Sequence, residues 1–189
     1  MGVIRLRPTA ATDDPFPCAL YASTRTEELA PVPWTEEEKR AFLEMQFRAQ
    51  SLHYSTHYSS ASFMVIESGG EPIGRLVVDR RPEDIRVVDI SLIPEHRGKG
   101  IGTMFLRELL NEAEGSGKSV SVHVEHFNPA MRLYDRLGFR RIDSHGVYHL
   151  MEWRAPSPGA ARHPLPQAGE GTRDPSPRGS GEKVPRSGG

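Results

Sequence analysis

The chain has 189 residues and a nearly balanced charge, with 24 Lys and Arg against 25 Asp and Glu. This length suits one domain with a sizeable core, and the charge balance excludes a general nucleic-acid-binding protein, which carries a basic excess. The single cysteine, Cys18, excludes an internal disulfide. Apolar runs are shorter than the about 18 residues that cross a bilayer, and the first residues lack the apolar stretch of a secretory signal. We therefore expect a cytoplasmic protein with no nucleic-acid or membrane partner.

Composition divides the chain after Trp153. Residues 155–189 contain seven prolines and seven glycines, a share above the roughly 25–30% typical of low-complexity chain. This segment has no aromatic residue and few large aliphatic ones, so it buries too little apolar surface to offset the entropy of ordering. We predict a folded domain over residues 1–154 and a disordered tail over 155–189.

The first half of the domain reads as a strand followed by two helices. Alternation predicts a strand over 3–7, and a helix is expected within 13–29. Thr35 and Glu38 have the spacing of a capping box and predict the start of the second helix. Its apolar residues at helical period are expected to face the core: Phe42, Met45, Ala49 and Leu52.

The second half alternates strands and helices. A hairpin is predicted from 63–67 and 73–79, and 85–93 has the apolar character of a central strand. The later elements are a helix over 101–113 ended by Gly115 and Gly117, a strand over 120–125, a short helix over 130–137, and strands over 139–143 and 147–153. The order predicts an α/β fold with a mixed sheet.

A glycine-rich turn joins the central strand to its helix. Gly98, Gly100 and Gly102 alternate along it, and glycines allow successive backbone N–H groups to point at one spot. That spot lies at the positive end of a helix, where Arg97 and Lys99 add charge. The turn predicts a pyrophosphate site, with a helix cap that binds no ligand as the alternative. Its spacing matches neither the NTPase loop nor the dinucleotide fingerprint.

Two motifs resemble those of the GNAT superfamily of N-acetyltransferases. Arg-x-x-Gly-x-Gly, from Arg97 to Gly102, resembles the signature that cradles the pyrophosphate of acetyl-CoA. Ala130, Tyr134, Gly138 and Phe139 match the spacing of the later motif, while Asn128 lies one residue closer to the alanine than usual. The resemblance implies a mixed, mostly antiparallel α+β sheet with splayed central strands and flanking helices.

The resemblance also implies a reaction and its residues. Acetyl-CoA would be the co-substrate, and a primary amine would attack it directly in a ternary complex. Backbone groups of Leu92 and Ile93 would bind the pantetheine arm and the thioester carbonyl, and Asn128 would contact the cofactor near its amide or thiol. Tyr134 would protonate the leaving thiolate. The phosphates would be bound by the turn and the first residues of the helix: Gly98, Lys99, Gly100, Ile101, Gly102 and Thr103.

The general base is sought among polar residues on the two central strands. Strand alternation places Asp89 on one face with Val87, and puts His123 and Glu125 together on the neighbouring strand. We expect these three polar residues to line the acceptor side, one of them taking the amine proton directly or through water. The alternative is that backbone donors satisfy Asp89 and that Glu125 is a solvated surface charge.

Several alternatives stay open. The chain could be a non-catalytic acyl-CoA-binding or sensor domain, or an acyltransferase with another donor or acceptor. The acceptor amine, on a small molecule or a protein, is not identified, although the net negative charge of the domain suits a cationic one. A homodimer is common among proteins with this resemblance. No metal site is predicted, since His53 and His57, four residues apart, have no nearby carboxylate.

Overall fold

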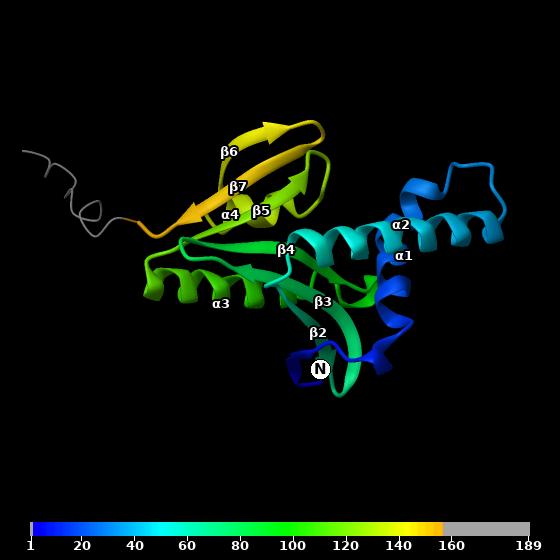
Figure 1. Cartoon of the computed structure of the whole chain (residues 1–189), viewed down its shortest axis with the longest axis horizontal. Helices are drawn as coiled ribbons and strands as arrows, with labels where there is room; N and C mark the ends of the chain where they lie inside the picture. The colour runs from blue at the N-terminus through cyan, green and yellow to red at the C-terminus, as the bar shows by residue number, and fades with distance from the viewer. Residues whose placement is uncertain (1, 157–189) are drawn as a thin grey trace, which may run out of the picture. The chain divides into compact units, whose positions relative to one another are not determined.

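The computed structural model describes residues 2–156, which form a seven-stranded sheet in the order β1-β2-β3-β4-β5-β7-β6 (Figure 1). Neighbouring strands run antiparallel except β4 and β5, which run parallel. The predicted mixed sheet is therefore confirmed. The strands are β1 (Ile4–Pro8), β2 (Ser62–Ser68), β3 (Glu71–Arg80), β4 (Asp84–Leu92), β5 (Ser119–Glu125), β6 (Arg140–His145) and β7 (Tyr148–Arg154). The helices are α1 (Phe16–Leu29), α2 (Glu36–His57), α3 (Ile101–Ser116) and α4 (Met131–Arg136).

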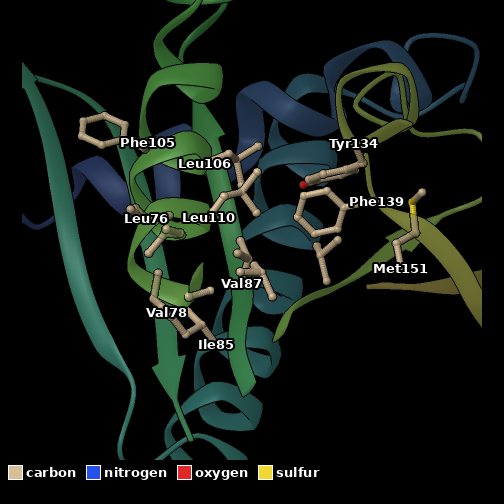
Figure 2. Close-up of a cluster of buried hydrophobic side chains, with 14 of the residues drawn as sticks. Leu76, Val78, Ile85, Val87, Phe105, Leu106, Leu110, Tyr134, Phe139 and Met151 are labelled. Carbon is tan, nitrogen blue, oxygen red and sulfur yellow. The ribbon is translucent and has the colours of Figure 1, made fainter. Parts of the chain in front are cut away.

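The main core lies between α3 and the central strands. Phe105, Leu106 and Leu110 of α3 pack against Val87 of β4 and its neighbours (Figure 2). Leu106 and Ile85 are completely buried, and each such side chain contributes about 2 kcal/mol to folding. The apolar stripe of α3 thus packs this helix against the central strands.

The central strands diverge halfway along their length. Residues 84–87 of β4 pair with 119–122 of β5, and the pairing stops there. At the same point a β-bulge interrupts the β3–β4 ladder, because Val77 pairs with Asp89 while Val78 pairs with Val87. The expected splay of the central strands is confirmed, and it opens beyond Val87.

The bulge corrects one expectation from strand alternation. Val87 was predicted to share a face with Asp89, but the unpaired Val88 shifts the alternation by one residue. Val87 belongs to the core cluster beside α3, whereas Asp89 pairs with Val77 on the opposite face. The polar side chain of Asp89 is thereby directed away from the α3 core.

Helix α2 begins as predicted but is oriented differently. Thr35 Oγ1 accepts a hydrogen bond from Glu38 N at 3.2 Å, and a carboxylate oxygen of Glu38 accepts one from Thr35 N at 2.7 Å. The expected core stripe is wrong, because Met45 is 56% and Leu52 69% exposed. The helix rests on α1, and its inward side carries Phe47, whose ring lies 5.9 Å from that of Tyr21. A helix supported mainly by another helix buries only a narrow strip.

Two further expectations concern the end of α3 and the segment that follows the folded domain. Helix α3 continues to Ser116 and ends at Gly117, which has a φ of +69°, so Gly115 lies inside the helix rather than after it. The predicted disordered tail lies, from residue 157 onward, outside the described residues. Among residues 2–156, no helix has both the length and the apolar character needed to cross a bilayer.

Candidate functional site

The turn between β4 and α3 presents unpaired backbone donors. Gly98 and Gly100 have φ angles of +70° and +81°, and a Cβ at either position would meet nothing within 4 Å. The turn therefore needs glycine for its backbone conformation rather than for space. Gly100 is the N-cap of α3, without a side-chain cap and without an acidic residue in the first turn. The N–H groups of residues 101–103 lack helical partners and can bind an anion.

The surroundings of this turn are open. A hollow of about 400 Å³ adjoins the first turns of α3, and Lys99 is exposed beside it. Lys99 forms no ion pair with any residue in the described range 2–156. The hollow is lined by Gly100, Thr103, Met104, Arg107, Glu108 and Asn111. The N–H groups at the start of α3 and the ammonium group of Lys99 are donors that suit a diphosphate.

Arg97 fastens the turn to its neighbours. Its Nε donates to the Leu92 carbonyl at 2.8 Å, and its Nη2 donates to Ser23 O and Oγ at 3.2 and 3.1 Å. The guanidinium was expected to add charge beside the phosphates. In the structure it links the end of β4 to α1 and so holds the turn in place.

Leu92 and Ile93 differ in whether their backbone N–H group is free to bind a ligand. Ile93 N donates to Ile73 O at 2.9 Å, and Ile93 O accepts from His96 N at 3.0 Å. Hydrogen-bonded and non-hydrogen-bonded pairs alternate in an antiparallel ladder, so the adjacent pair of Leu92 with Gly74 is not hydrogen-bonded. The N–H and C=O of Leu92 therefore point away from β3, toward the opening left by β5. Leu92, rather than Ile93, offers its N–H to a ligand in the splay.

Tyr134 of α4 points into the same region. Its side chain is 4% exposed and packs against Phe139 with ring centroids 5.4 Å apart. The hydroxyl forms no hydrogen bond with the described residues and is directed toward α3 and β4 (Figure 2). Burial raises the pKa of Tyr134, and the nearby charge of Asp89 raises it further. Tyr134 is therefore a protonated, unpaired donor at neutral pH.

Asn128 caps the turn that precedes α4. Its Oδ1 accepts from Ala130 N at 2.9 Å, and its carbonyl accepts from Met131 N at 3.0 Å. The oxygen of the side chain is thus used within the protein. The side-chain amide nitrogen makes no hydrogen bond to the residues that the structure describes and is the part left for a cofactor contact.

The three candidate bases are each paired with a different arginine. Asp89 accepts a short hydrogen bond from Arg75, whose Nη2 also donates to Gln50 at 3.0 Å. The Arg75 guanidinium lies 5.9 Å from the ring centres of both Phe47 and Tyr54. Asp89 is therefore satisfied by a buried side chain, not by the backbone donors considered from the sequence.

His123 has no free lone pair for proton transfer. Its Nδ1 lies 3.0 Å from Arg86 Nη1, and arginine can only donate, so Nδ1 accepts and the neutral ring carries its proton on Nε2. Burial lowers the pKa of His123, and Arg86 lowers it further. Both effects favour the neutral ring, and the hydrogen bond from Arg86 occupies its basic nitrogen.

Glu125 is more exposed than Asp89 and, unlike His123, keeps a basic atom to which no described residue donates a hydrogen bond. It lies at the end of β5, beyond the last residue paired with β4. Its Oε1 accepts from Arg25 Nη2 at 3.1 Å and from the Tyr148 hydroxyl at 3.4 Å, and its side chain is 33% exposed. Glu125 keeps a second carboxylate oxygen for a proton or a ligand.

The arginines and Tyr148 were not identified from the sequence. Arg25 lies 100 residues before Glu125, and Arg86 lies 37 before His123. No short motif links such positions, and only the tertiary fold brings them together. Within residues 2–156, no cluster of three or more potential metal ligands is present.

Comparisons with known proteins agree on one family. The acetyltransferase (GNAT) family matches residues 20–139. An N-alpha-acetyltransferase RimI of Mycobacterium tuberculosis is 32% identical over 97 residues, which cover 49% of this chain and 58% of that protein. A mycothiol acetyltransferase of Corynebacterium glutamicum is 26% identical over 135 residues, covering 65% and 45%. The chain thus spans about half the length of these curated relatives.

Solved structures share the fold. The paia N-acetyltransferase of Thermoplasma acidophilum, in complex with coenzyme A, has a TM-score of 0.63 at 18% identity and covers 81% of this chain and 99% of that one. The ribosomal-protein-S18-alanine N-acetyltransferase of Escherichia coli has a TM-score of 0.54 at 17% identity, covering 85% and 99%. At these identities the likeness concerns the fold.

Proposed function

The chain belongs to the GNAT acetyltransferase family, and from this premise we propose that it transfers the acetyl group of acetyl-CoA to a primary amine. The family match covers both motifs recognised in the sequence, and each of the two splayed strands ends shortly before one of them. Acetyl-CoA supplies the acetyl group as an activated thioester. The amine nitrogen bonds to the carbonyl carbon, and the carbon–sulfur bond breaks.

The glycine turn holds the diphosphate in this proposal. No side chain caps the N–H groups of residues 101–103. These groups, with the turn around Gly98, would donate hydrogen bonds to the diphosphate. Lys99 adds a positive charge beside them. The Leu92 N–H binds the arm or the carbonyl oxygen within the splay, where a preorganised donor stabilises developing negative charge.

Tyr134 acts as the acid. Its unpaired hydroxyl points toward the β4 side of the splay, where the thiolate leaves. An ordinary tyrosine has a pKa near 10 against about 8.5 for a thiol, and burial raises the pKa of Tyr134. Tyr134 therefore first donates a hydrogen bond to the thiolate. Transfer of its proton to the sulfur is uphill and requires that the site stabilise the products.

Glu125 acts as the base. It lies at the open end of the splay with its side chain one-third exposed, at 33%, whereas Asp89 is mostly buried and the Nδ1 of His123 is occupied by Arg86. Glu125 accepts the amine proton directly or through one water molecule. Arg25 and Tyr148 position its carboxylate and keep one of its oxygens occupied.

The observation that carries this proposal is the uncapped glycine turn at the start of α3, beside the splayed strands. The test is consumption of acetyl-CoA by the purified chain with a panel of primary amines, with the acetylated product identified by mass spectrometry. Product formation that depends on both substrates is expected. Tight coenzyme A binding without turnover of any amine would favour the alternative, a non-catalytic sensor. A cytoplasmic location and a homodimer remain predictions.

A further inference from the structure

A second hollow lies between α1 and α2, away from the glycine turn. Its volume is about 210 Å³, which is below the roughly 300–1,000 Å³ of sites for drug-sized ligands. Its walls are mostly apolar and aromatic, with one arginine and one glutamate. The lining residues are Tyr21, Arg25, Glu28, Leu29, Phe42, Leu43 and Gln46.

One side chain connects this hollow to the proposed base. Arg25 lines the hollow, its guanidinium carbon lies 5.9 Å from the centre of the Tyr21 ring, and its Nη2 reaches Glu125 Oε1 at 3.1 Å. A molecule seated in the hollow therefore lies one arginine side chain away from Glu125. Arg25 thus links the lining of the hollow to the end of β5.

The charges along this link sum to a negative value. Arg25 Nη1 lies 3.0 Å from both oxygens of Glu28, while its Nη2 binds Glu125. One arginine thus faces two carboxylates, and its donors are already engaged. An incoming ammonium group gains from the excess carboxylate, whereas a carboxylate on the acceptor would meet two like charges and no free cation.

We propose that this hollow selects the acceptor, which is a small primary amine carrying one apolar or aromatic group and no carboxylate. The inference rests on the proposed acetyl transfer and names its substrate class. The apolar group packs between Tyr21, Phe42 and Leu43, and the amine points toward Glu125. The small volume disfavours long polyamines and multi-ring polycations.

The test compares three acceptors, of which the first two share one skeleton. Initial rates with acetyl-CoA are measured for 2-phenylethylamine, for phenylalanine, which adds a carboxylate, and for spermidine, which lacks an apolar group. We expect kcat/KM for 2-phenylethylamine to exceed the values for the other two at least tenfold. Equal or higher values for phenylalanine or spermidine, or no turnover of 2-phenylethylamine by a chain that binds coenzyme A, would overturn the inference.

A pair of variants on α2 locates the effect. Phe42→Ala enlarges the hollow and is expected to raise the KM for 2-phenylethylamine about tenfold with little change in kcat. Met45→Ala, on the exposed side of the same helix, is the matched control and should leave both constants unchanged. An unchanged KM in Phe42→Ala overturns the inference. Turnover of spermidine alone would leave acetyl transfer intact, whereas failure to bind coenzyme A would instead reject the proposed function.

Discussion

Arg25 of α1 and Glu125 of β5 are joined by an ion pair of 3.1 Å across 100 residues of sequence. This pair ties the first helix to the open end of the splayed strands. The same carboxylate receives the Tyr148 hydroxyl from β7, so three elements meet at Glu125. The position of the proposed base is therefore set by tertiary structure and not by the strand that carries it.

Replacing Glu125 by glutamine tests its role as the base. The Glu125→Gln side chain keeps the shape but cannot accept the amine proton, so kcat/KM should fall about 100-fold, within the range for general base catalysis. Initial rates at neutral pH provide the measurement. His123→Gln is the comparison, because His123 already uses its lone pair on Arg86, and its activity should stay within about threefold of wild type. A reversed order of the two variants would reject the assignment.

Tyr134→Phe separates catalysis from packing. The hydroxyl has no hydrogen-bond partner among the described residues, so its removal should change the free energy of unfolding by less than about 0.5 kcal/mol. The value of kcat should nevertheless fall about 100-fold, because the leaving thiolate loses its donor. Urea unfolding and single-turnover rates measure the two effects. Full activity in this variant would exclude Tyr134 as the acid.

Asp89 and Arg75 form a pair whose side chains are only 14% and 11% exposed. Asp89→Asn leaves a buried guanidinium without its counter-charge, and we expect a loss of about 3 kcal/mol in the free energy of unfolding. The double variant Asp89→Leu with Arg75→Met should recover part of this loss, since no charge is then buried alone. Urea unfolding of the single and double variants measures both values. A double variant that is no more stable than Asp89→Asn would contradict the account.

Asp13 predicts a pH dependence of stability. Two hydrogen bonds from Arg7, at 2.8 and 2.6 Å, and one from Ala10 N lower the pKa of Asp13 to about 2. The unfolded value is near 3.9, so the stabilisation is present above pH 4 and is lost as the pH falls through about 2. Melting temperatures measured between pH 5 and 2 should fall more steeply in wild type than in Asp13→Asn. Parallel curves would show that Asp13 titrates normally.

Local patterns in the sequence predicted the elements that depend on neighbouring residues. The capping box at Thr35 and the glycine turn were found because a few adjacent residues determine each structure. The bulge at Val88 was missed, since it is defined by the register of two strands and leaves no mark on an apolar run. The exposure of Met45 was missed because helical period shows which residues share a side but not which side is covered.

The candidate site divides in the same way. The glycine turn and Tyr134 were identified by motif spacing, and their roles in binding the diphosphate and in protonating the thiolate stay predictions. The arginine partners of Asp89, His123 and Glu125 could not be predicted, because each contact joins different elements of the fold. Those partners, together with the exposure of each side chain, are the basis for proposing Glu125 as the base.

The most direct test of the whole account is a calorimetric titration of the folded chain with coenzyme A. We predict saturable binding to one site, weakened at least tenfold in Gly100→Ala, because Gly100 has a φ of +81° and an added side chain would displace the N–H groups of the turn. Gly115→Ala, inside the same helix with open space around it, should bind as wild type does. No binding heat from a demonstrably folded wild-type chain, or undiminished affinity in Gly100→Ala, would contradict the claim that this turn binds the diphosphate.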